Sequence, residues 1–253
     1  DTPKGDYQQT LQKIRSLIDQ LTDNKHLAIG IGTPGASSPH TGLMRNANST
    51  CLNGQPLQQD LEELLQRPVR VANDADCFAL SEANDGAGKD ANSVFGVIVG
   101  TGTGGGLVIH KQLLQGPNAI AGEWGHNPLP WPQKNELPGP QCYCGKQGCV
   151  ETWLSGPGLA RDHGGEIQAK EIIQQAKQSE KQALATLERY YDRMARCLAQ
   201  VINIVDPEVI VLGGGLSNVE TLYTEVPRRL PRYVLRRSDA SIAPLPSSGL
   251  PRP

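Results

Sequence analysis

Residues 122–126 read GEWGH, and residues 142–151 read CYCGKQGCVE. The second stretch holds three of the six cysteines of the chain within eight residues. These cysteines are Cys142, Cys144 and Cys149. Three thiolates and one upstream imidazole, that of His126, make a tetrahedral Cys3His zinc site. Four protein ligands leave no open coordination position, so this zinc would be structural rather than catalytic.

The residues alone leave alternatives to this zinc site. The three thiols would be free or paired in disulfides, and His126 would be a polar residue that is satisfied by another partner. In a reducing compartment, closely spaced cysteines favour a metal over disulfides. Gly145 and Gly148 also allow the tight backbone curl that converging sulfurs need.

The overall composition indicates a globular chain without a nucleic-acid or membrane partner. The 253 residues are 38% hydrophobic and carry a formal net charge of −2. No basic run suggests a nucleic-acid groove, and no apolar stretch reaches the roughly 18–20 residues that span a bilayer. The first ten residues, DTPKGDYQQT, lack the apolar run of a secretory signal. We therefore expect a soluble, cytoplasmic protein.

Hydrophobic periodicity predicts helices that alternate with short buried strands, which is typical of an α/β fold. A first helix, capped by Asp6, is predicted to bury one stripe of apolar residues. The stripe consists of Leu11, Ile14, Leu17, Ile18 and Leu21. Buried strands are predicted at residues 26–31, 69–72, 94–99, 107–110 and 209–212, and further helices at 76–84, at 169–205 with a break near Ser179, and around 219–230. Residues 238–253 predict no regular element.

Two glycine-rich turns follow predicted strands and are candidate phosphate-binding elements. Residues 100–106 read GTGTGGG, so backbone N–H groups and the hydroxyls of Thr101 and Thr103 would surround a phosphate. No GK[ST] follows, so this is not a Walker A loop, and a flexible hairpin turn fits the same residues. Residues 213–215 read GGG between a predicted strand and helix. They would place a nucleotide phosphate at the helix N-terminus or merely allow a tight turn.

Acidic and polar residues near these turns are candidates for catalysis and binding. Asp74 follows a predicted strand beside Asn73, and a carboxylate at a strand end can accept a proton from a hydroxyl. An Asx turn or a helix N-cap explains the same pair and is the commoner arrangement. Glu123, His126 and Glu151 flank the cysteines and would hydrogen-bond a polyhydroxylated ligand. A surface salt bridge at Glu151, and support of the metal ligands by Glu123, are the alternatives.

Seven segments, in family order over roughly residues 1–220, resemble the ROK family of repressors and sugar kinases. They are GIGTPG (30–35), NANST (46–50), NDA (73–75), GTGTGGG (100–106), GEWGH (122–126), CYCGKQGCVE (142–151) and VLGGGLS (211–217). GEWGH followed by the Cys-x-Cys-Gly-x-x-Gly-Cys run is highly specific for this family. The longer strings NANSTCLNGQPL, AGEWGHNPLPW and CYCGKQGC look most like its bacterial fructokinase branch, with N-acetylglucosamine and N-acetylmannosamine kinases as the nearest alternatives.

The resemblance implies an α/β, actin-like (ribonuclease H-like) fold with two lobes and a cleft between them. It implies ATP-dependent phosphorylation of a hexose 6-hydroxyl, D-fructose first, with Asp74 as the general base. Mg²⁺ would bridge the ATP phosphates, and a structural Zn²⁺ would stiffen residues 116–158. Many relatives form homodimers, so a homodimer is expected here.

The resemblance also implies which residues bind each ligand. Sugar hydroxyls would be bound by Gly35, Asn48, Asn73, Asp74, Glu123, His126 and Glu151. ATP would be bound by Gly100, Thr101, Gly102, Thr103, Gly104, Gly105, Gly106, Leu107, Gly213, Gly214 and Gly215. Zinc would be bound by His126, Cys142, Cys144 and Cys149.

The sequence departs from the family pattern at both ends. Family members begin with a strand and an Asp-x-Gly-Gly-Thr phosphate turn and close with a His-Gly-Asp segment and a helix, and these segments are not found here. We therefore expect a small N-terminal lobe at 1–91, without its first strands and phosphate turn, and a large C-terminal lobe with the zinc loop at 92–253. A sugar-sensing transcriptional regulator of the ROK type and a non-catalytic, zinc-stabilised sugar-binding domain are the other two functions considered.

Overall fold

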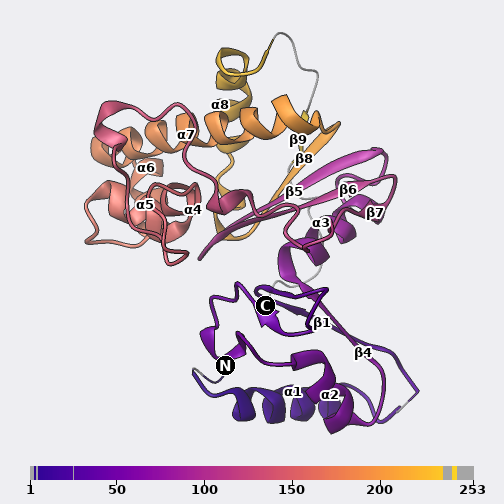
Figure 1. Ribbon diagram of the computed structural model, residues 1–253. Helices are drawn as coiled ribbons and strands as arrows, with labels where there is room; N and C mark the ends of the chain where they lie inside the picture. The colour runs from indigo at the N-terminus through magenta and orange to yellow at the C-terminus, as the bar shows by residue number, and fades with distance from the viewer. Residues whose placement is uncertain (1–2, 4, 25, 236–240, 244–253) are drawn as a thin grey trace. The chain divides into compact units, whose positions relative to one another are not determined.

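The computed structural model describes residues 3, 5–24, 26–235 and 241–243 (Figure 1). The chain divides into two compact units. Unit 1 consists of Asp1–Cys77 and Gln115–Ala121, and unit 2 consists of Phe78–Leu114 and Gly122–Pro253. The main chain passes from one unit to the other within helix α3 (Asp74–Asn84) and again at either end of residues 115–121. The two lobes that the sequence analysis expects, at residues 1–91 and 92–253, stay a prediction.

Unit 1 is built on a parallel pair of strands. β1 (Ile29–Thr33) and β4 (Val69–Asn73) pair in register from Ile29↔Val69 to Thr33↔Asn73. The unit also contains α1 (Tyr7–Leu21), β2 (Ala36–Ser37), β3 (Met44–Arg45), the 3-10 helix η1 (Thr50–Leu52) and α2 (Leu57–Leu65). One apolar cluster, which includes Met44, Leu57, Leu61 and Val69, joins these elements. Both predicted strands of this region, 26–31 and 69–72, are therefore confirmed, the first with a shift toward Thr33.

Helix α1 confirms the predicted cap but buries a narrower stripe than expected. The carboxylate of Asp6 accepts a hydrogen bond from the N–H of Gln9 at 2.9 Å. Leu11 and Ile18 are buried, whereas Leu17 is 45% exposed and Leu21 is 83% exposed. Leu17 lies about 100° around the helix from Ile18, because each residue turns the helix by about 100°. A 3–4 spacing alone does not specify how wide the buried stripe is.

Unit 2 contains a five-stranded mixed sheet in the order β7-β6-β5-β8-β9. Its strands are β5 (Ser93–Val99), β6 (Thr103–Ile109), β7 (Gln112–Leu113), β8 (Val209–Gly213) and β9 (Ser241–Ala243). β5 and β6 are antiparallel, while β8 runs parallel to β5 and to β9. β9 lies where no element was predicted, since pairing with β8 supplies backbone hydrogen bonds that no local pattern reveals. Of residues 238–253, the others lie outside the described residues.

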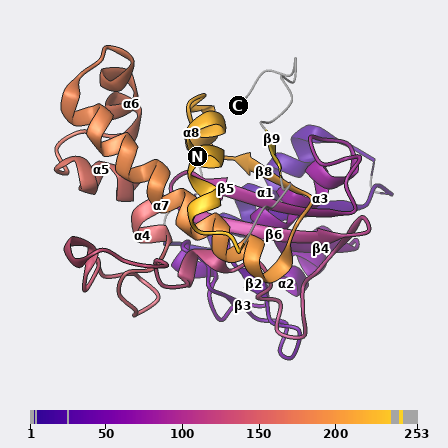
Figure 2. The same ribbon diagram turned by 90° about the horizontal axis from the view of Figure 1, so that it is seen from above.

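Helices cover both faces of this sheet (Figure 2). Along β5, Phe95 and Val97 face a cluster that contains the long helix α7 (Lys181–Val205), while Val94 faces a cluster with α3. This alternation follows from the two-residue period of a strand. The approach of α3 is close, because a Cβ atom at Gly96 would lie 2.6 Å from the Cβ atom of Ala79.

The remaining helical segments of unit 2 include the helices predicted at 169–205 and around 219–230, together with four segments between residues 124 and 163 where no helix was predicted. They are η2 (Trp124–His126), η3 (Lys134–Glu136), α4 (Glu151–Leu154), α5 (Gly156–His163), α6 (Ala169–Lys177), η4 (Gly215–Asn218), α8 (Leu222–Arg229) and η5 (Leu230–Arg232). The predicted break near Ser179 is confirmed, with this residue at φ 64° between α6 and α7. Among the described residues, no helix combines the length and apolar character that a membrane span requires.

Candidate functional site

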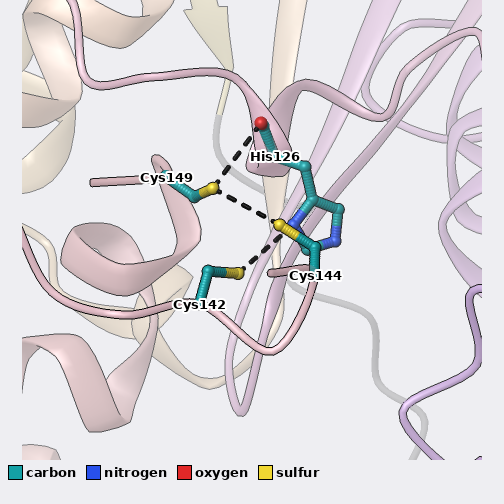
Figure 3. A group of neighbouring side chains, drawn as sticks. All are labelled: His126, Cys142, Cys144 and Cys149. Atoms are coloured by element: carbon teal, nitrogen blue, oxygen red, sulfur yellow. Dashed lines mark hydrogen bonds between the residues drawn. The ribbon is translucent and has the colours of Figure 1, made fainter. Parts of the chain in front are cut away.

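The three clustered cysteines and His126 converge on one point, as predicted (Figure 3). Their four candidate ligand atoms all lie within 4.8 Å of one another. The Sγ atoms of Cys144 and Cys149 are 3.6 Å apart, and Cys142 Sγ lies 3.6 Å from Nδ1 of His126. The sulfur separation rules out a disulfide between Cys144 and Cys149, which requires about 2.05 Å.

Backbone geometry explains why these side chains converge. Gly145 has φ 87° and Gly148 has φ 68°, conformations that favour glycine. The N–H of Cys142 donates to the carbonyl of Lys146 at 2.8 Å, which closes a tight turn around the first two cysteines. An isolated bridge between Pro128 and Cys149 then brings the third cysteine next to the segment that carries His126.

The cluster fits a tetrahedral zinc ion. Zn–S bonds of about 2.3 Å and Zn–N bonds of about 2.0 Å place tetrahedral ligand atoms roughly 3.6–3.8 Å apart. The separations of 3.6 Å observed here match that range. Burial, followed by the neighbouring thiols of Cys144 and Cys142, raises the pKa of Cys149 to about 12. A bound cation favours the thiolate, so metal binding at this cluster would release protons.

Tyr143 is a site residue that the sequence analysis missed. It lies between two of the cysteines, and its hydroxyl is 3.0 Å from Nε2 of His126. Nδ1 of His126 faces the sulfurs, so the two ring nitrogens have separate partners. Burial of the hydroxyl and the carboxylates of Glu151 and Glu123 raise the pKa of Tyr143, so this phenol lies near both predicted sugar-binding acids. Its position between two metal ligands was the available signal.

The loop that carries the cluster is also anchored by buried ion pairs. Glu136, in η3, accepts hydrogen bonds from Arg193 Nε at 2.8 Å and from Arg196 Nη2 at 2.7 Å. Both arginines lie on α7, and all three residues are buried. Burial alone would raise the pKa of Glu136, but hydrogen bonds from the arginines and from the N–H of Gln133 lower it to about 2. The loop is therefore attached to the core independently of its metal ligands.

We expect Glu136→Gln to lower the free energy of unfolding at pH 7 by about 3 kcal/mol, because it removes a buried carboxylate that two buried arginines share. Arg193 then keeps its ion pair with Asp162, and Arg196 keeps its ion pair with Asp192. The pKa of Glu136 is lower in the folded chain than in the unfolded chain, where it is about 4.3. Its contribution is thus present above pH ~5 and is lost as the pH falls toward 2. Urea titrations from pH 7 to pH 3 should show a flatter pH dependence for the variant. The exposed Glu171, changed to Gln, is the control, and equal stabilities of wild type and Glu136→Gln would contradict this account.

The glycine stretch 100–106 is only partly a turn, which corrects the sequence interpretation. The turn comprises Gly100, Thr101 and Gly102, and the strand β6 begins at Thr103. Gly104, Gly105 and Gly106 pair with β5, and a Cβ atom at Gly105 would lie 2.9 Å from the indole of Trp124. These glycines therefore allow close packing within the sheet rather than a longer loop. Leu107, the last residue assigned to ATP, is buried in the core.

The start of β6 is in contact with the segment that follows the cysteines. Oε2 of Glu151 accepts a hydrogen bond from the N–H of Thr103 at 2.9 Å. The hydroxyl of Thr103 is buried and has no hydrogen-bond partner in the part of the chain that the structure describes. Thr101, by contrast, is exposed.

The second glycine segment lies next to the first. A Cβ atom at Gly100 would lie 3.7 Å from the backbone nitrogen of Gly215. Gly214 has φ 83°, and a Cβ atom there would lie 2.4 Å from the carbonyl oxygen of Val99. A Cβ atom at Gly213 would meet the ring of Phe78 at 2.6 Å. Packing explains Gly213 and Gly214, and the structure brings Gly100 and Gly215, both predicted to bind nucleotide, close together.

The predicted residues of unit 1 form a separate group. Oδ1 of Asn73 accepts from the N–H groups of Ala75 at 2.9 Å and Asp76 at 3.1 Å, so Asn73 caps helix α3. Nδ2 of Asn73 donates to the carbonyl of Gly35 at 3.1 Å. The helix-cap alternative is therefore correct for Asn73, while Asp74 is exposed at the first position of the helix.

Gly35, which accepts the hydrogen bond from Asn73, packs closely against residues 45–47, the segment just before Asn48. Gly35 has φ 75°, and a Cβ atom there would lie 2.5 Å from the carbonyl oxygen of Arg45 and 2.7 Å from the nitrogen of Ala47. Asn48, the next residue, is exposed. Unit 1 thus connects Gly35 to Asn73, the residue before Asp74, and packs Gly35 against Ala47, the residue before Asn48. Glu123, His126 and Glu151 belong to unit 2.

Comparison with known proteins gives consistent similarities. The sequence model of the ROK family matches residues 1–249. The chain is 40% identical over 245 residues to the N-acetyl-D-glucosamine kinase of Yersinia pseudotuberculosis serotype O:1b (strain IP 31758), which covers 93% of this chain and 81% of the relative. The structure is similar to that of the ROK hexokinase from Thermus thermophilus, with a TM-score of 0.80, 28% identity and coverage of 98% and 84% of the two chains. It is equally similar to a ROK family glucokinase from Streptomyces griseus in complex with glucose and AMPPNP, with a TM-score of 0.80, 25% identity and coverage of 96% and 84%.

Proposed function

This chain belongs to the ROK family, and from that premise we propose that it is an ATP-dependent sugar kinase. Its mixed α/β fold is the actin-like fold of ROK sugar kinases. The observation that carries the proposal is the 40% identity to a named sugar kinase over 93% of this chain. The kinase with bound glucose and AMPPNP, a nucleotide analogue, supports the pairing of a sugar with a nucleotide.

The sugar we propose first is N-acetyl-D-glucosamine, phosphorylated at its 6-hydroxyl. The names of the most similar relatives favour it over D-fructose, which the sequence analysis placed first. Fructose remains the second candidate, because the strings NANSTCLNGQPL, AGEWGHNPLPW and CYCGKQGC resemble the fructokinase branch.

In the proposed reaction, the Asp74 carboxylate accepts the proton of the 6-hydroxyl as that oxygen bonds to the γ-phosphorus of ATP. The bond from this phosphorus to the β,γ-bridging oxygen breaks, and ADP leaves. Glu123, His126 and Glu151 hydrogen-bond other sugar hydroxyls and fix its orientation. Backbone N–H groups of Thr101, Gly102 and Gly215 hold phosphate oxygens, while the N–H of Gly100 closes the turn on the carbonyl of Gly102. Mg²⁺ neutralises phosphate charge when bound.

The structural zinc ion belongs to this proposal as well. His126, Cys142, Cys144 and Cys149 would hold it, and its role is to keep the loop rigid. The fit of their ligand atoms to a tetrahedron supports this assignment. The predicted homodimer and cytoplasmic location are retained as further parts of the proposal.

A sugar panel tests the activity and its specificity. With ATP and Mg²⁺, we expect kcat/KM for N-acetyl-D-glucosamine to exceed that for fructose, glucose and N-acetyl-D-mannosamine by at least about tenfold, because a site built around one set of polar groups rejects others. Coupled detection of ADP measures turnover, and a reaction without sugar gives background ATP hydrolysis. A higher value for fructose would reinstate the fructokinase hypothesis. Sugar binding without phosphorylation of any hexose would favour the sensor or the sugar-binding domain instead.

A further inference from the structure

A short segment joins the cysteine cluster to the glycine turn Gly100–Gly102. At one end of the turn, Oε2 of Glu151 accepts from the N–H of Thr103 at 2.9 Å. At the other end, the N–H of Gly156 donates to the carbonyl of Gly100 at 2.7 Å. Residues 151–156 therefore hold both ends of the turn, and we call this segment the clamp.

The clamp and the turn are in close contact at Gly102. A Cβ atom at Gly102 would lie 2.8 Å from Oε2 of Glu151, so any larger residue would displace the carboxylate. Within the turn, the N–H of Gly100 donates to the carbonyl of Gly102 at 2.9 Å. A turn with two glycines among its three residues has high conformational freedom when nothing else restrains it.

The clamp follows directly from a zinc ligand. The carbonyl of Cys149 accepts from the N–H of Thr152 at 2.9 Å and from its hydroxyl at 2.7 Å. The N–H of Ser155 then donates to the carbonyl of Glu151 at 3.1 Å. Thr152, Ser155 and the apolar residues between them are buried. These bonds connect Cys149 to the helix α4 that begins at Glu151, so a displacement of Cys149 is passed on to Glu151.

We propose that the clamp makes the affinity for nucleotide depend on zinc, with Glu151 as the positioning residue that orders the glycine turn. This inference rests on the proposed function, in which the turn binds ATP phosphates. A turn that is already ordered loses less conformational entropy when the nucleotide binds. Zinc at the cysteines and nucleotide at the turn are then coupled sites, although neither ligand touches the other. Because the Thr103 N–H is bound by Oε2, the other carboxylate oxygen of Glu151, Oε1, is left for the predicted hydrogen bond to the sugar.

The test measures binding of Mg²⁺-AMPPNP by isothermal titration calorimetry, without sugar and without turnover. Glu151→Ala removes the acceptor for the Thr103 N–H and should raise the Kd about tenfold. Glu151→Gln keeps a side-chain oxygen at this place and should raise the Kd by less than about threefold. Both variants are measured with zinc bound, and their melting temperatures confirm that they are folded. A Kd for Glu151→Ala equal to that of wild type would overturn the proposal.

Zinc removal supplies the second arm of the test. Depletion should raise the Kd of wild type about tenfold but should change that of Glu151→Ala little, because the clamp is already broken there. Equal losses in both proteins would mean that zinc acts by another route, and the proposal would fail. The comparison of the two zinc-bound variants remains decisive if the zinc-free chain does not fold. A wild-type chain that binds no Mg²⁺-AMPPNP would refute the proposed function itself, whereas normal binding that is insensitive to Glu151 refutes only the clamp.

Discussion

Asp74→Asn should lower kcat for sugar phosphorylation by about 10²- to 10⁴-fold, the range expected when a general base is lost. The amide has nearly the same shape as the carboxylate, and its oxygen can still accept from the N–H of Ala75, as Oδ1 of Asp74 does at 2.9 Å. Helix α3 should therefore start in the same way. The substitution removes the negative charge and with it the ability to take up a proton, but it keeps the shape of the side chain, so KM for the sugar should change much less than kcat.

Asp76→Asn is the matched control for this experiment. Both aspartates lie in the first turn of α3, so each substitution removes one negative charge from the same helix N-terminus. That loss costs about 0.3–1 kcal/mol of stability in either case. If the two variants melt at similar temperatures and only Asp74→Asn loses turnover, the effect is chemical. Turnover by Asp74→Asn within a few-fold of wild type would remove Asp74 from the role of base.

The helix start at Asp74 shows how a structural and a functional interpretation can both hold. The sequence offered a helix cap and a catalytic acid as competing explanations of Asn73-Asp74. In the structure, Asn73 provides the cap with its side-chain oxygen, and Asp74 is left exposed at the next position. Because the neighbouring residue caps the helix, the carboxylate of Asp74 is not needed for that purpose.

Features set by local chemistry were predictable from the sequence. The Asp6 cap, the break at Ser179 and the convergence of the cysteines each depend on a few neighbouring residues with strong backbone preferences. Glycines were harder to interpret, because this residue type is used both in turns and where the backbone packs closely against a neighbour. Gly105 lies in a strand because Trp124 packs against it, which depends on a residue 19 positions away in the sequence.

Long-range polar contacts could not be predicted at all. Glu136 pairs with Arg193 and Arg196 across 57 and 60 positions of the sequence, and Glu151 meets Thr103 across 48. Each partner alone is an ordinary charged or polar residue, and no periodic pattern marks a pair that tertiary packing brings together. Tyr143 escaped notice for a related reason, since its hydroxyl gains a role only from the position of His126.

Cys149→Ser should remove zinc and destabilise the chain, with the largest effect on stability among our predictions. The wild-type chain is expected to carry one zinc ion, and the variant to retain less than about a tenth of that amount, because a serine hydroxyl is not ionised at neutral pH and binds zinc weakly. The melting temperature should fall by about 10 °C or more, since binding energy at a structural zinc site contributes to folding. Elemental analysis of the purified chains and thermal melts followed by circular dichroism measure the two quantities.

Substitutions at two other cysteines serve as controls that distinguish the loss of zinc from the loss of a thiol. Cys51 lies in unit 1 and is partly buried, so Cys51→Ser should keep both zinc and stability close to wild type. Cys197 is buried within α7, so Cys197→Ser should lower the melting temperature through a polar group in the core while the zinc content stays at one per chain. Loss of zinc confined to Cys149→Ser would identify the ligand, because of these three thiols that of Cys149 belongs to the cluster, 3.6 Å from the sulfur of Cys144. Equal zinc contents in all three variants would show that Cys149 is not a ligand, and no zinc in the wild-type chain would show that the cluster is held without metal.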